Sequence, residues 1–575
     1  MTYPTAGALV ASRDSNFIFG SLGNGRATLT INGVPVRVLP NGAWIAYLAN
    51  PPVSLARYEI VAVLGRDTAR LVHPVRLIPP RPLLAATGPL VVDSASVAPR
   101  APMTLRADEL VRVSVRAPAN ASVWVRSDSL THRPLVNAGA RPVQTSPSAA
   151  PDSTPRRFIG DTLLWATDLP ARSLSARAEL VVARGLDTAR FPLGLITVLP
   201  DSTAGWALLG ADPGAVSDTD RVIIARPTPG GTYKWFLLPG TQVQVTGRIG
   251  ESVRVRLDAA LEVWVAASDV RALPAGYPAP RRTATDARVA PAEGWADVVI
   301  PTGQRPPFLV EEHGNDLVLT LYGTQATTDI IHYARNDSLV RVVTWEPLTG
   351  DRARYTVRLA TPPFGYLAFW DRGSLVLRVR RAPRVDRARP LRGLTIAVDP
   401  GHPPIGSTGP TGLYEPVPAL AVGLRLKTLL EARGATVVMT RSSAAAVALG
   451  DRPIIARRAN AHALVSIHLN ALPDGVNPFG AHGTGSYFFH PQAEPLARAL
   501  QRGMVARMGL RNLGVYYDNL ALARPTWMPA VLCEGAFIII PEQEAALRTP
   551  QFQEAYALGV AEGLEAYFRA LPATP

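Results

Sequence analysis

The stretch that decides the fold of the last third of the chain is LTIAVDPGHPPIGSTGPTGLYE, residues Leu394 to Glu415. Its first five residues, 394–398, are a short apolar run rich in β-branched side chains, which predicts a buried strand. The run ends in DPGH, residues 399–402, where proline and glycine stop the strand and leave His402 at its carboxyl end. Open α/β sheets bind their ligands at that end of the strands.

Two further strand patterns end in residues that can carry chemistry. LVSIH, residues 464–468, closes on His468, and AVLCE, residues 530–534, closes on Glu534. Glu415 follows the loop behind the first strand and begins a long helical pattern. Two imidazoles and a carboxylate at the mouth of one sheet suit a catalytic zinc ion, which takes three nitrogen or oxygen ligands and keeps a fourth position for water. Glu534 would then be a general base within reach of that water.

A lone histidine at a strand end is more often a loop or packing residue than a ligand. The agreement of several strand ends is what favours a metal here. The four motifs DPGH (399–402), GLYE (412–415), SIHLN (466–470) and PAVLCEG (529–535) stand in this order along the chain.

Together these motifs resemble the zinc-dependent N-acetylmuramoyl-L-alanine amidases, the third amidase family of bacterial cell-wall hydrolases, over about Leu391 to Phe568. The resemblance implies one zinc ion per chain, held by His402, Glu415 and His468. It also implies that Glu534 is the catalytic base and later the proton donor. It further implies cleavage of the amide bond between N-acetylmuramic acid and the first L-Ala of the stem peptide. Two departures concern the substrate loops: Pro403-Pro404 stands where the family usually has Gly-Gly, and residues 535–541 differ from its usual pattern.

At 575 residues the chain is too long for one core, so several domains are expected. The residues before the amidase-like segment alternate in short apolar and polar runs between Gly, Pro and Asn turns, which predicts four all-β modules. The multidomain architecture that we predict is, in order: an Ig-like sandwich at 1–84, a second sandwich at 85–199, a bacterial SH3-like barrel at 200–274, a β-rich targeting (AMIN-like) domain at 293–382, and the C-terminal α/β zinc amidase domain at 391–575. Neither sandwich gathers catalytic side chains, which favours a spacer role.

Several local signals support this division. Asn32-Gly33 between two apolar runs predicts a hairpin. Residues 59–70 recur as residues 179–190 at a constant offset, which predicts the same hairpin in both sandwiches. Proline-rich composition predicts a loop from Gln144 to Pro155 and a linker from Pro274 to Pro291.

In the last domain the pattern switches to α/β. The expected helices and strands are: helices from Glu415 to about Gly434, 451–460, 494–508 and 552–568, and strands at 394–398, 435–440, 464–468, 484–489 and 531–534. Between Asn470 and Thr484, prolines and glycines exclude a stable helix that could cover the zinc ion, since each costs a helix interior about 3 and about 1 kcal/mol respectively. We therefore expect an open site, and a fragment from about Leu391 that is active without an activator.

Composition narrows the setting of the protein. The net charge is +14, but the cations are scattered, and many arginines alternate with apolar residues as on the solvated face of strands, so nucleic acid is not expected as a partner. A positive surface would be attracted to an anionic cell-wall polymer such as peptidoglycan, and the β modules offer surfaces for envelope protein partners. The sequence has no uninterrupted run of about 18 apolar residues, so we expect no membrane-spanning helix. The start at Met1 reads as the front of a mature, exported protein of the periplasm or cell wall, whose signal peptide is absent from this chain.

The single cysteine, Cys533, excludes an intrachain disulfide and is expected to pack in the core, on the sheet face opposite Glu534. Two other functions compete with the amidase. The same ligand chemistry would suit a zinc carboxypeptidase acting on peptidoglycan, and the β modules could belong to a non-enzymatic envelope adaptor whose last domain is inert. The retention of all four site residues argues against the adaptor.

Overall fold

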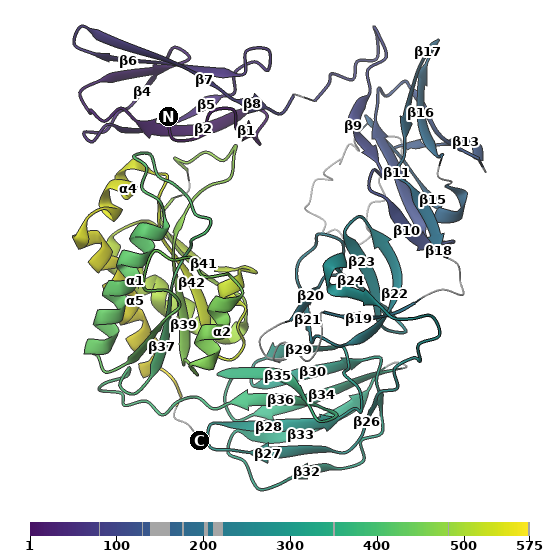
Figure 1. Cartoon of the computed structure of the whole chain (residues 1–575), viewed down its shortest axis with the longest axis vertical. Coiled ribbons are helices and arrows are strands. Elements are labelled where there is room, and N and C mark those ends of the chain that lie inside the picture. The colour runs from purple at the N-terminus through teal and green to yellow at the C-terminus, as the bar shows by residue number, and fades with distance from the viewer. Residues whose placement is uncertain are drawn as a thin grey trace, which may run out of the picture.

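A mostly β region precedes a C-terminal α/β domain, as the sequence predicts (Figure 1). The computed structural model describes residues 1–79, 81–128, 130–138, 162–174, 177–199, 205–210, 222–348, 351–480 and 482–572. The predicted loop from Gln144 to Pro155 lies outside these residues. The β modules follow one another around the molecule, and the first module lies against the last domain (Figure 1). No helix in the described part of the chain is long and apolar enough to span a membrane.

The first module has three small sheets, of order β4-β3-β6-β7, β2-β5 and β1-β8. Its strands are β1 (Leu9–Val10), β2 (Ser15–Ser21), β3 (Thr28–Ile31), β4 (Val34–Val36), β5 (Ala43–Ala49), β6 (Arg57–Leu64), β7 (Asp67–Pro74) and β8 (Arg76–Leu77). The predicted hairpin forms between β3 and β4, where Asn32 and Gly33 both take positive φ, as a two-residue hairpin turn requires.

The second module packs two four-stranded sheets, of order β14-β15-β11-β9 and β13-β12-β16-β17. Its elements are β9 (Asp93–Ala98), β10 (Met103–Arg106), β11 (Leu110–Arg116), β12 (Ser122–Ser127), β13 (Leu130–Pro134), β14 (Val136–Asn137), β15 (Leu164–Pro170), η2 (Ala171–Ser173), β16 (Glu179–Arg184), β17 (Asp187–Pro192) and β18 (Ile196–Leu199). The repeat detected in the sequence is confirmed as two equivalent hairpins. Leu64 pairs with Asp67 in the first module, and Arg184 pairs with Asp187 in the second.

The third module shares a sheet with the second. Strands β10 and β18, from the second module, join it because Met103 of β10 pairs with Ile249 of β22 and β18 pairs with β10. The elements of the third module are β19 (Trp206–Leu209), β20 (Ile223–Ala225), β21 (Trp235–Leu237), β22 (Gln242–Ile249), β23 (Ser252–Asp258), β24 (Leu261–Ala266), η3 (Ala267–Asp269) and β25 (Val270–Ala272). No sequence pattern predicts that these two modules share a sheet, because the pattern within a strand does not show which distant strand it pairs with.

The fourth module packs a five-stranded sheet, β32-β27-β28-β36-β35, against a four-stranded sheet, β29-β30-β34-β33. Its strands are β26 (Thr283–Ala284), β27 (Ala287–Pro291), β28 (Trp295–Pro301), β29 (Phe308–His313), β30 (Asp316–Tyr322), β31 (Gln325–Ala326), β32 (Ile331–Tyr333), β33 (Val340–Pro347), β34 (Arg352–Leu359), β35 (Gly365–Asp371) and β36 (Ser374–Arg380). The predicted linker from Pro274 to Pro291 is wrong at its end, because β27 is a full strand of this sheet. Ala287 and Val289 alternate into the core, and that period outweighs the linker-like composition.

The C-terminal domain is a six-stranded sheet of order β38-β37-β39-β42-β40-β41, in which only the β42–β40 pair is antiparallel. Its elements are β37 (Thr395–Pro400), α1 (Pro416–Ala432), β38 (Thr436–Met439), α2 (Asp451–Arg458), β39 (Ala463–Asn470), β40 (Thr484–Phe488), η4 (Pro491–Ala493), α3 (Glu494–Met508), β41 (Asn512–Tyr517), η5 (Ala521–Ala523), β42 (Ala530–Phe537), α4 (Pro541–Leu547) and α5 (Pro550–Arg569). Helices α1, α3 and α5 pack on one face of the sheet and α2 on the other (Figure 1).

Candidate metal centre

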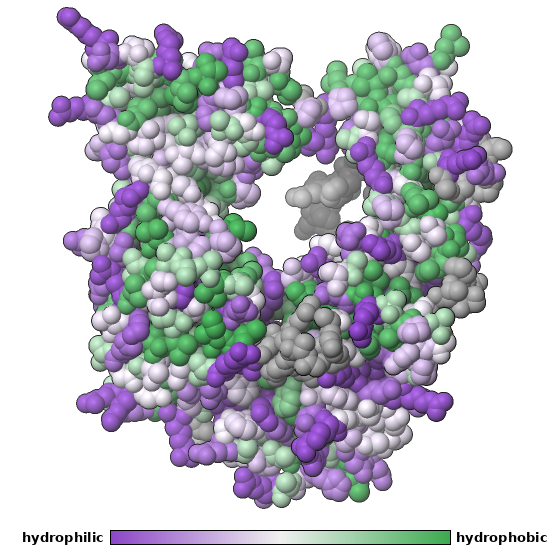
Figure 2. All heavy atoms as spheres, viewed as in Figure 1, coloured by the Kyte–Doolittle hydropathy of each residue, from purple (hydrophilic) through white to green (hydrophobic). Residues whose placement is uncertain are grey.

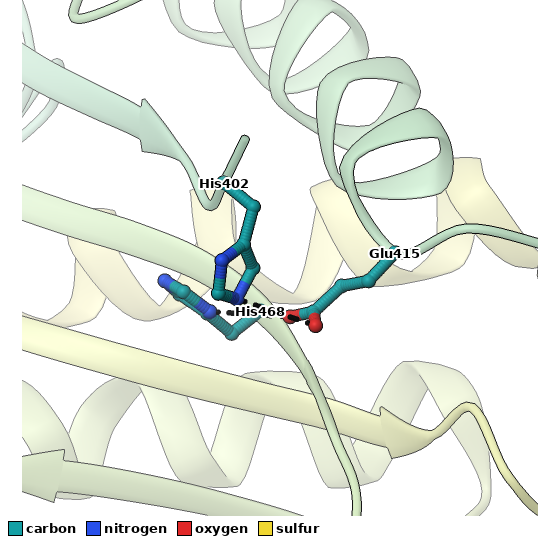
Figure 3. A group of neighbouring side chains, drawn as sticks. All are labelled: His402, Glu415 and His468. Atoms are coloured by element: carbon teal, nitrogen blue, oxygen red, sulfur yellow. Dashed lines mark hydrogen bonds and ion pairs between the residues drawn. The ribbon is translucent and has the colours of Figure 1, made fainter. Parts of the chain in front are cut away.

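Three side chains converge at the carboxyl ends of β37 and β39 (Figure 3). His402 lies two residues beyond β37, His468 lies on β39, and Glu415 lies directly before α1. Parallel pairing of β37 with β39 brings the two strand ends together, since Pro400 is in register with Ile467. The structure thus assembles the three ligands that the sequence predicts, from segments up to 66 residues apart, into one group.

The spacing of these side chains fits a zinc ion. One ligand atom from each residue lies within 4.8 Å of the others. His402 Nε2 is 3.3 Å from Glu415 Oε2, and His468 Nδ1 is 3.2 Å from Glu415 Oε1. Tetrahedral ligands at about 2.0–2.2 Å from zinc lie about 3.3–3.6 Å from one another, so the donor set fits the metal in both type and spacing.

Glu415 is the buried centre of this group. Its Oε1 accepts a hydrogen bond from Leu469 N and its Oε2 accepts one from Ser407 N. Burial alone would raise the pKa of Glu415, but the hydrogen bonds and charges of His402 and His468 outweigh burial and lower that pKa to about 2. The carboxylate is therefore ionised at neutral pH, as a metal ligand must be.

Glu534 lies beside this group on β42. It is in register with His468 on the neighbouring strand, so the two side chains share one face of the sheet. Its Oε2 is buried and has no hydrogen-bond partner. Burial, followed by the negative charge of Glu415, raises the pKa of Glu534 well above its usual range. A buried carboxyl oxygen without a partner, facing a metal-ligand set, is suited to bind a proton and to release it.

A buried ionic network holds the turn that carries His402. Asp399 accepts hydrogen bonds from Thr440 Oγ1, Ser466 Oγ and Arg452 Nη1. Arg452 Nη2 also donates to the backbone oxygens of His402 and Pro403, at 2.9 and 3.0 Å. His402 has φ +56°, which is uncommon for a residue with a side chain, and these donors stabilise that conformation.

A second guanidinium supports the same turn. Arg441 donates to the backbone oxygens of Pro400, Gly401 and Pro416. No local sequence pattern indicates a role for Arg441, Arg452 or Asp399 in supporting the site. Asp399 stands out as an acidic residue that closes an apolar strand, but its partners come from segments about 40 to 70 residues away and no local pattern announces them.

The loop that ends at Glu415 has its own support from α4. Glu544 is fully buried, and its carboxylate accepts hydrogen bonds from Thr411 N, Thr411 Oγ1 and Leu413 N. Gly409 lies directly against this carboxylate, and a Cβ there would come within 2.6 Å of it. Glu544 therefore fixes the position of the turn two residues before the candidate ligand.

Among the described residues between β39 and β40, 471–480 and 482–483, no helix forms, as the prolines and glycines predict. The side chains of His402 and His468 keep 27 % and 13 % of their area exposed. The group is therefore open to solvent. Cys533, by contrast, is fully buried, and burial raises the pKa of its thiol, in keeping with the core role predicted for it.

Comparison with known proteins places these residues in a family. Residues 396–566 match the family model described as N-acetylmuramoyl-L-alanine amidase. The chain is 32 % identical over 208 residues to the probable cell wall amidase LytH of Staphylococcus saprophyticus, covering 36 % of this chain and 67 % of that protein. It is 34 % identical over 185 residues to the probable cell wall amidase LytH of Staphylococcus epidermidis, covering 32 % of this chain and 60 % of that one. Among solved structures, N-acetylmuramoyl-L-alanine amidase AmiC2 of Nostoc punctiforme is 29 % identical, with 30 % of this chain and 96 % of that chain covered and a TM-score of 0.29.

Proposed function

We propose, from the premise that this chain belongs to the N-acetylmuramoyl-L-alanine amidase family, that it is a peptidoglycan hydrolase acting on the amide bond between N-acetylmuramic acid and the first L-Ala of the stem peptide. The observation that carries the proposal is the group of His402, Glu415 and His468 beside Glu534, inside the segment 396–566 that matches the family. The ligand chemistry supports metal-assisted hydrolysis, and the family supplies the choice of bond.

We propose His402, Glu415 and His468 as the ligands of one zinc ion. When bound, zinc lowers the pKa of a coordinated water to about 7 and polarises a substrate carbonyl. As ligands, Glu415 would bring one negative charge and the two histidines would bind as neutral imidazoles, so a bound Zn²⁺ would keep a net positive charge. The side chains of His402 and His468 are partly exposed, so water and substrate could reach an ion that these residues would hold.

Glu534 is the proposed general base. Its partner-free Oε2 can accept a proton from the attacking water and then return that proton to the amine of the leaving stem peptide. Glu534 lies on β42, between β39 and β40, and is in register with Gly485 of β40. The rings of Tyr487 and Tyr516 lie against Gly485, within 3.6 Å of where its Cβ would stand.

The test compares the wild type with Glu534→Gln, using purified peptidoglycan and mass analysis of the fragments. The amide is nearly isosteric but accepts no proton, so we expect zinc and fold to be retained while hydrolysis falls by about 10²–10⁴-fold. Glu554→Gln, which changes an outward-facing carboxylate on α5, is the matched control and should be fully active. His402→Ala or His468→Ala should lose bound zinc as well as activity. Retained hydrolysis in His402→Ala, or zinc loss in Glu534→Gln, would overturn these roles.

The products separate the competing functions. Intact free stem peptides indicate the amidase, and release of D-Ala alone indicates a zinc carboxypeptidase. A chain that binds no zinc even after loading indicates a non-enzymatic adaptor. Measuring zinc per chain is therefore the first experiment.

We further propose that the β region places the enzyme on the cell envelope, outside the cytoplasm. In this proposal residues 1–84 and 85–199 are Ig-like sandwiches, 200–274 an SH3-like barrel and 293–382 a targeting domain. The net charge of +14 supports attraction to an anionic wall polymer. Envelope proteins are possible partners of the same modules.

A further inference from the structure

The first β module and the catalytic domain stand at opposite ends of the chain but meet in space. The modules curve around so that the first one lies on the loops of the last domain (Figure 1), and the molecule encloses an opening between its two arms (Figure 2). The contact closes this ring. Its residues come from within the first 50 of the chain and from loops at the carboxyl end of the catalytic sheet.

The polar part of this contact is built around Asp474, in the loop between β39 and β40. Its carboxylate accepts hydrogen bonds from the Tyr3 hydroxyl, from Ala11 N at 2.6 Å and from Asn16 Nδ2 at 3.3 Å. Asn16 is fully buried. Burial, followed by the hydrogen bond to Asp474, raises the pKa of Tyr3 above its usual range, so its hydroxyl stays a donor at neutral pH.

The next residue of the loop is held as firmly. Gly475 N donates to Asn16 Oδ1 at 2.8 Å, and Gly475 O accepts from the Tyr47 hydroxyl at 2.9 Å. Gly475 has φ +85°, and a Cβ there would come within 2.9 Å of Ser12 Oγ. Backbone and side chains of the module therefore follow the shape of this loop closely.

The apolar part of the contact is continuous with the core of the catalytic domain. Phe17 and Phe19, on β2, are 2 % and 3 % exposed and belong to the same buried cluster as the catalytic sheet and helices. Tyr3 stacks on both rings at 5.4 Å, and Ala471 and Leu472 of the loop pack against the same cluster. A continuous apolar cluster of this kind is typical of the core of a single domain. Two modules joined by a flexible linker usually have separate cores.

Each loop that the module touches is next to a residue of the metal centre. Asp474 and Leu472 belong to the loop that begins three residues after His468. Thr2 Oγ1 donates to Pro410 O, in the loop between His402 and Glu415. The module also lies beside α4, whose Glu544 fixes the turn before Glu415, through a solvent-exposed pair between Arg37 and Glu542 at 3.6 Å.

We propose that the first β module is a built-in part of the amidase, which positions the loops on either side of the metal centre for substrate. This role rests on the proposed function. The module lies beside the centre and not over it, since His402 keeps 27 % of its side chain exposed. This positioning role differs from the spacer role expected from the sequence. It predicts that a fragment beginning at Leu391 has reduced hydrolytic activity, because the apolar surface of the catalytic domain that Phe17 and Phe19 cover would be exposed.

The test uses the full chain loaded with zinc, in four forms: wild type, Asp474→Ala, Asp474→Asn and Tyr3→Phe. Asp371→Ala, which changes an exposed carboxylate in the hairpin between β35 and β36, is the matched control. Hydrogen exchange of residues 1–20 and 471–480 reports docking without reference to activity. Zinc per chain, kcat and KM on soluble peptidoglycan fragments report the metal centre.

We expect Asp474→Ala to raise exchange in both segments by about tenfold or more, because it leaves three donors without their acceptor. Zinc content should stay at the wild-type level, while kcat falls about 10- to 100-fold, as small misplacements of substrate-positioning groups do. Asp474→Asn should recover part of the loss because it keeps one acceptor oxygen. Tyr3→Phe, which keeps the ring stack, should be the mildest change, and Asp371→Ala should match the wild type.

Three results would overturn the role. Faster exchange with unchanged kcat and KM would mean that the module is a spacer, and higher activity in Asp474→Ala would mean that it is a lid. Unchanged exchange in both segments would mean that the contact does not hold the loop. A wild-type chain that binds zinc but hydrolyses no peptidoglycan would instead overturn the proposed function, and the positioning role with it.

Discussion

Replacing Glu312 by glutamine should stabilise the chain at neutral and alkaline pH. Glu312 lies on β29 of the fourth module, and its side chain is only 3 % exposed where that module meets the catalytic domain. Its Oε2 accepts a hydrogen bond from Gln492 N at 2.8 Å, and Tyr366 also bonds to the carboxylate. The nearest imidazole, His490, lies 3.8 Å away, but burial lowers the pKa of His490 to about 4, so it brings no positive charge at pH 7.

Without a cation beside it, burial raises the pKa of Glu312 from 4.5 to about 7. The folded chain therefore keeps a proton that the unfolded chain releases. The stability that this proton contributes is fully present below about pH 4.5 and is lost as the pH rises through about 7. One pKa unit corresponds to 1.36 kcal/mol, so the wild type should lose about 3 kcal/mol at this site between those pH values.

Glutamine keeps the shape of the side chain, accepts from Gln492 N and does not ionise. The free energy of unfolding of Glu312→Gln should therefore exceed that of the wild type by a margin that grows to about 3 kcal/mol by pH 8. Denaturant unfolding at pH 5, 6, 7 and 8, followed by tryptophan fluorescence, measures this margin. His490 contributes an opposite slope below pH 6.5, because its lowered pKa makes the fold lose stability as the pH falls, and it does so equally in both proteins.

Glu346→Gln is the matched control, since Glu346 lies in the same module but forms an exposed pair with Arg354. Its profile should follow that of the wild type at every pH. Parallel profiles for wild type and Glu312→Gln, or a Glu312→Gln protein that is less stable at pH 8, would refute the reasoning.

Two further outcomes follow from burial near the metal centre. Gly401→Ala should lose most of its bound zinc, because a Cβ at Gly401 would lie 2.4 Å from His468 Cε1 and would displace the imidazole. The control Gly450→Ala, where a Cβ meets nothing within 4 Å, should bind as much zinc as the wild type. Full zinc binding by Gly401→Ala would contradict this account. Because the thiol of Cys533 is fully buried and its pKa is raised, it should not react with a disulfide reagent in the native chain. In denaturant it should react once per chain, and rapid labelling of the native chain would disprove this prediction.

The elements that the sequence predicts well are those with a strong local pattern. The helix expected at 494–508 has those bounds in the structure, where Gly509 ends it in the left-handed region. Helix α1 begins after Glu415 with Pro416 in its first turn, and Gly434 takes φ +85° just beyond it. Three strand ends are wrong, because β37 includes Pro400, and β39 and β42 continue past His468 and Glu534 to Asn470 and Phe537. Pairing with the neighbouring strands extends them, since Pro400 is in register with Ile467 and Asn470 with Phe537.

The elements that were missed depend on distant partners. Strand β41 lies at the sheet edge and forms through parallel pairing with β40, where Tyr487 is in register with Tyr516. Helix α4 has only seven residues, too few to be stable alone, and Glu544 ties it to Thr411. For the same reason, the sequence indicated which residues could bind zinc but not what holds them there.

The contact between the fourth module and the catalytic domain supports the metal centre from the other end of the catalytic sheet. Arg380 of β36 is 4 % exposed and donates to the backbone oxygens of Asn460, Ala461 and Trp527. Burial lowers its pKa to about 10, so it is still a cation at pH 7, and a buried cation is tolerated only where its donors are satisfied.

These three carbonyls precede β39 and β42, the strands that carry His468 and Glu534. The first module holds the loop at the opposite end of β39, through Asp474. A catalytic group has to be held within about 0.5 Å of its working position, and strands that are tied at both ends meet that demand better than strands ending in free loops. The contacts of the first and fourth modules therefore tie β39 and β42 at the ends that flank His468 and Glu534.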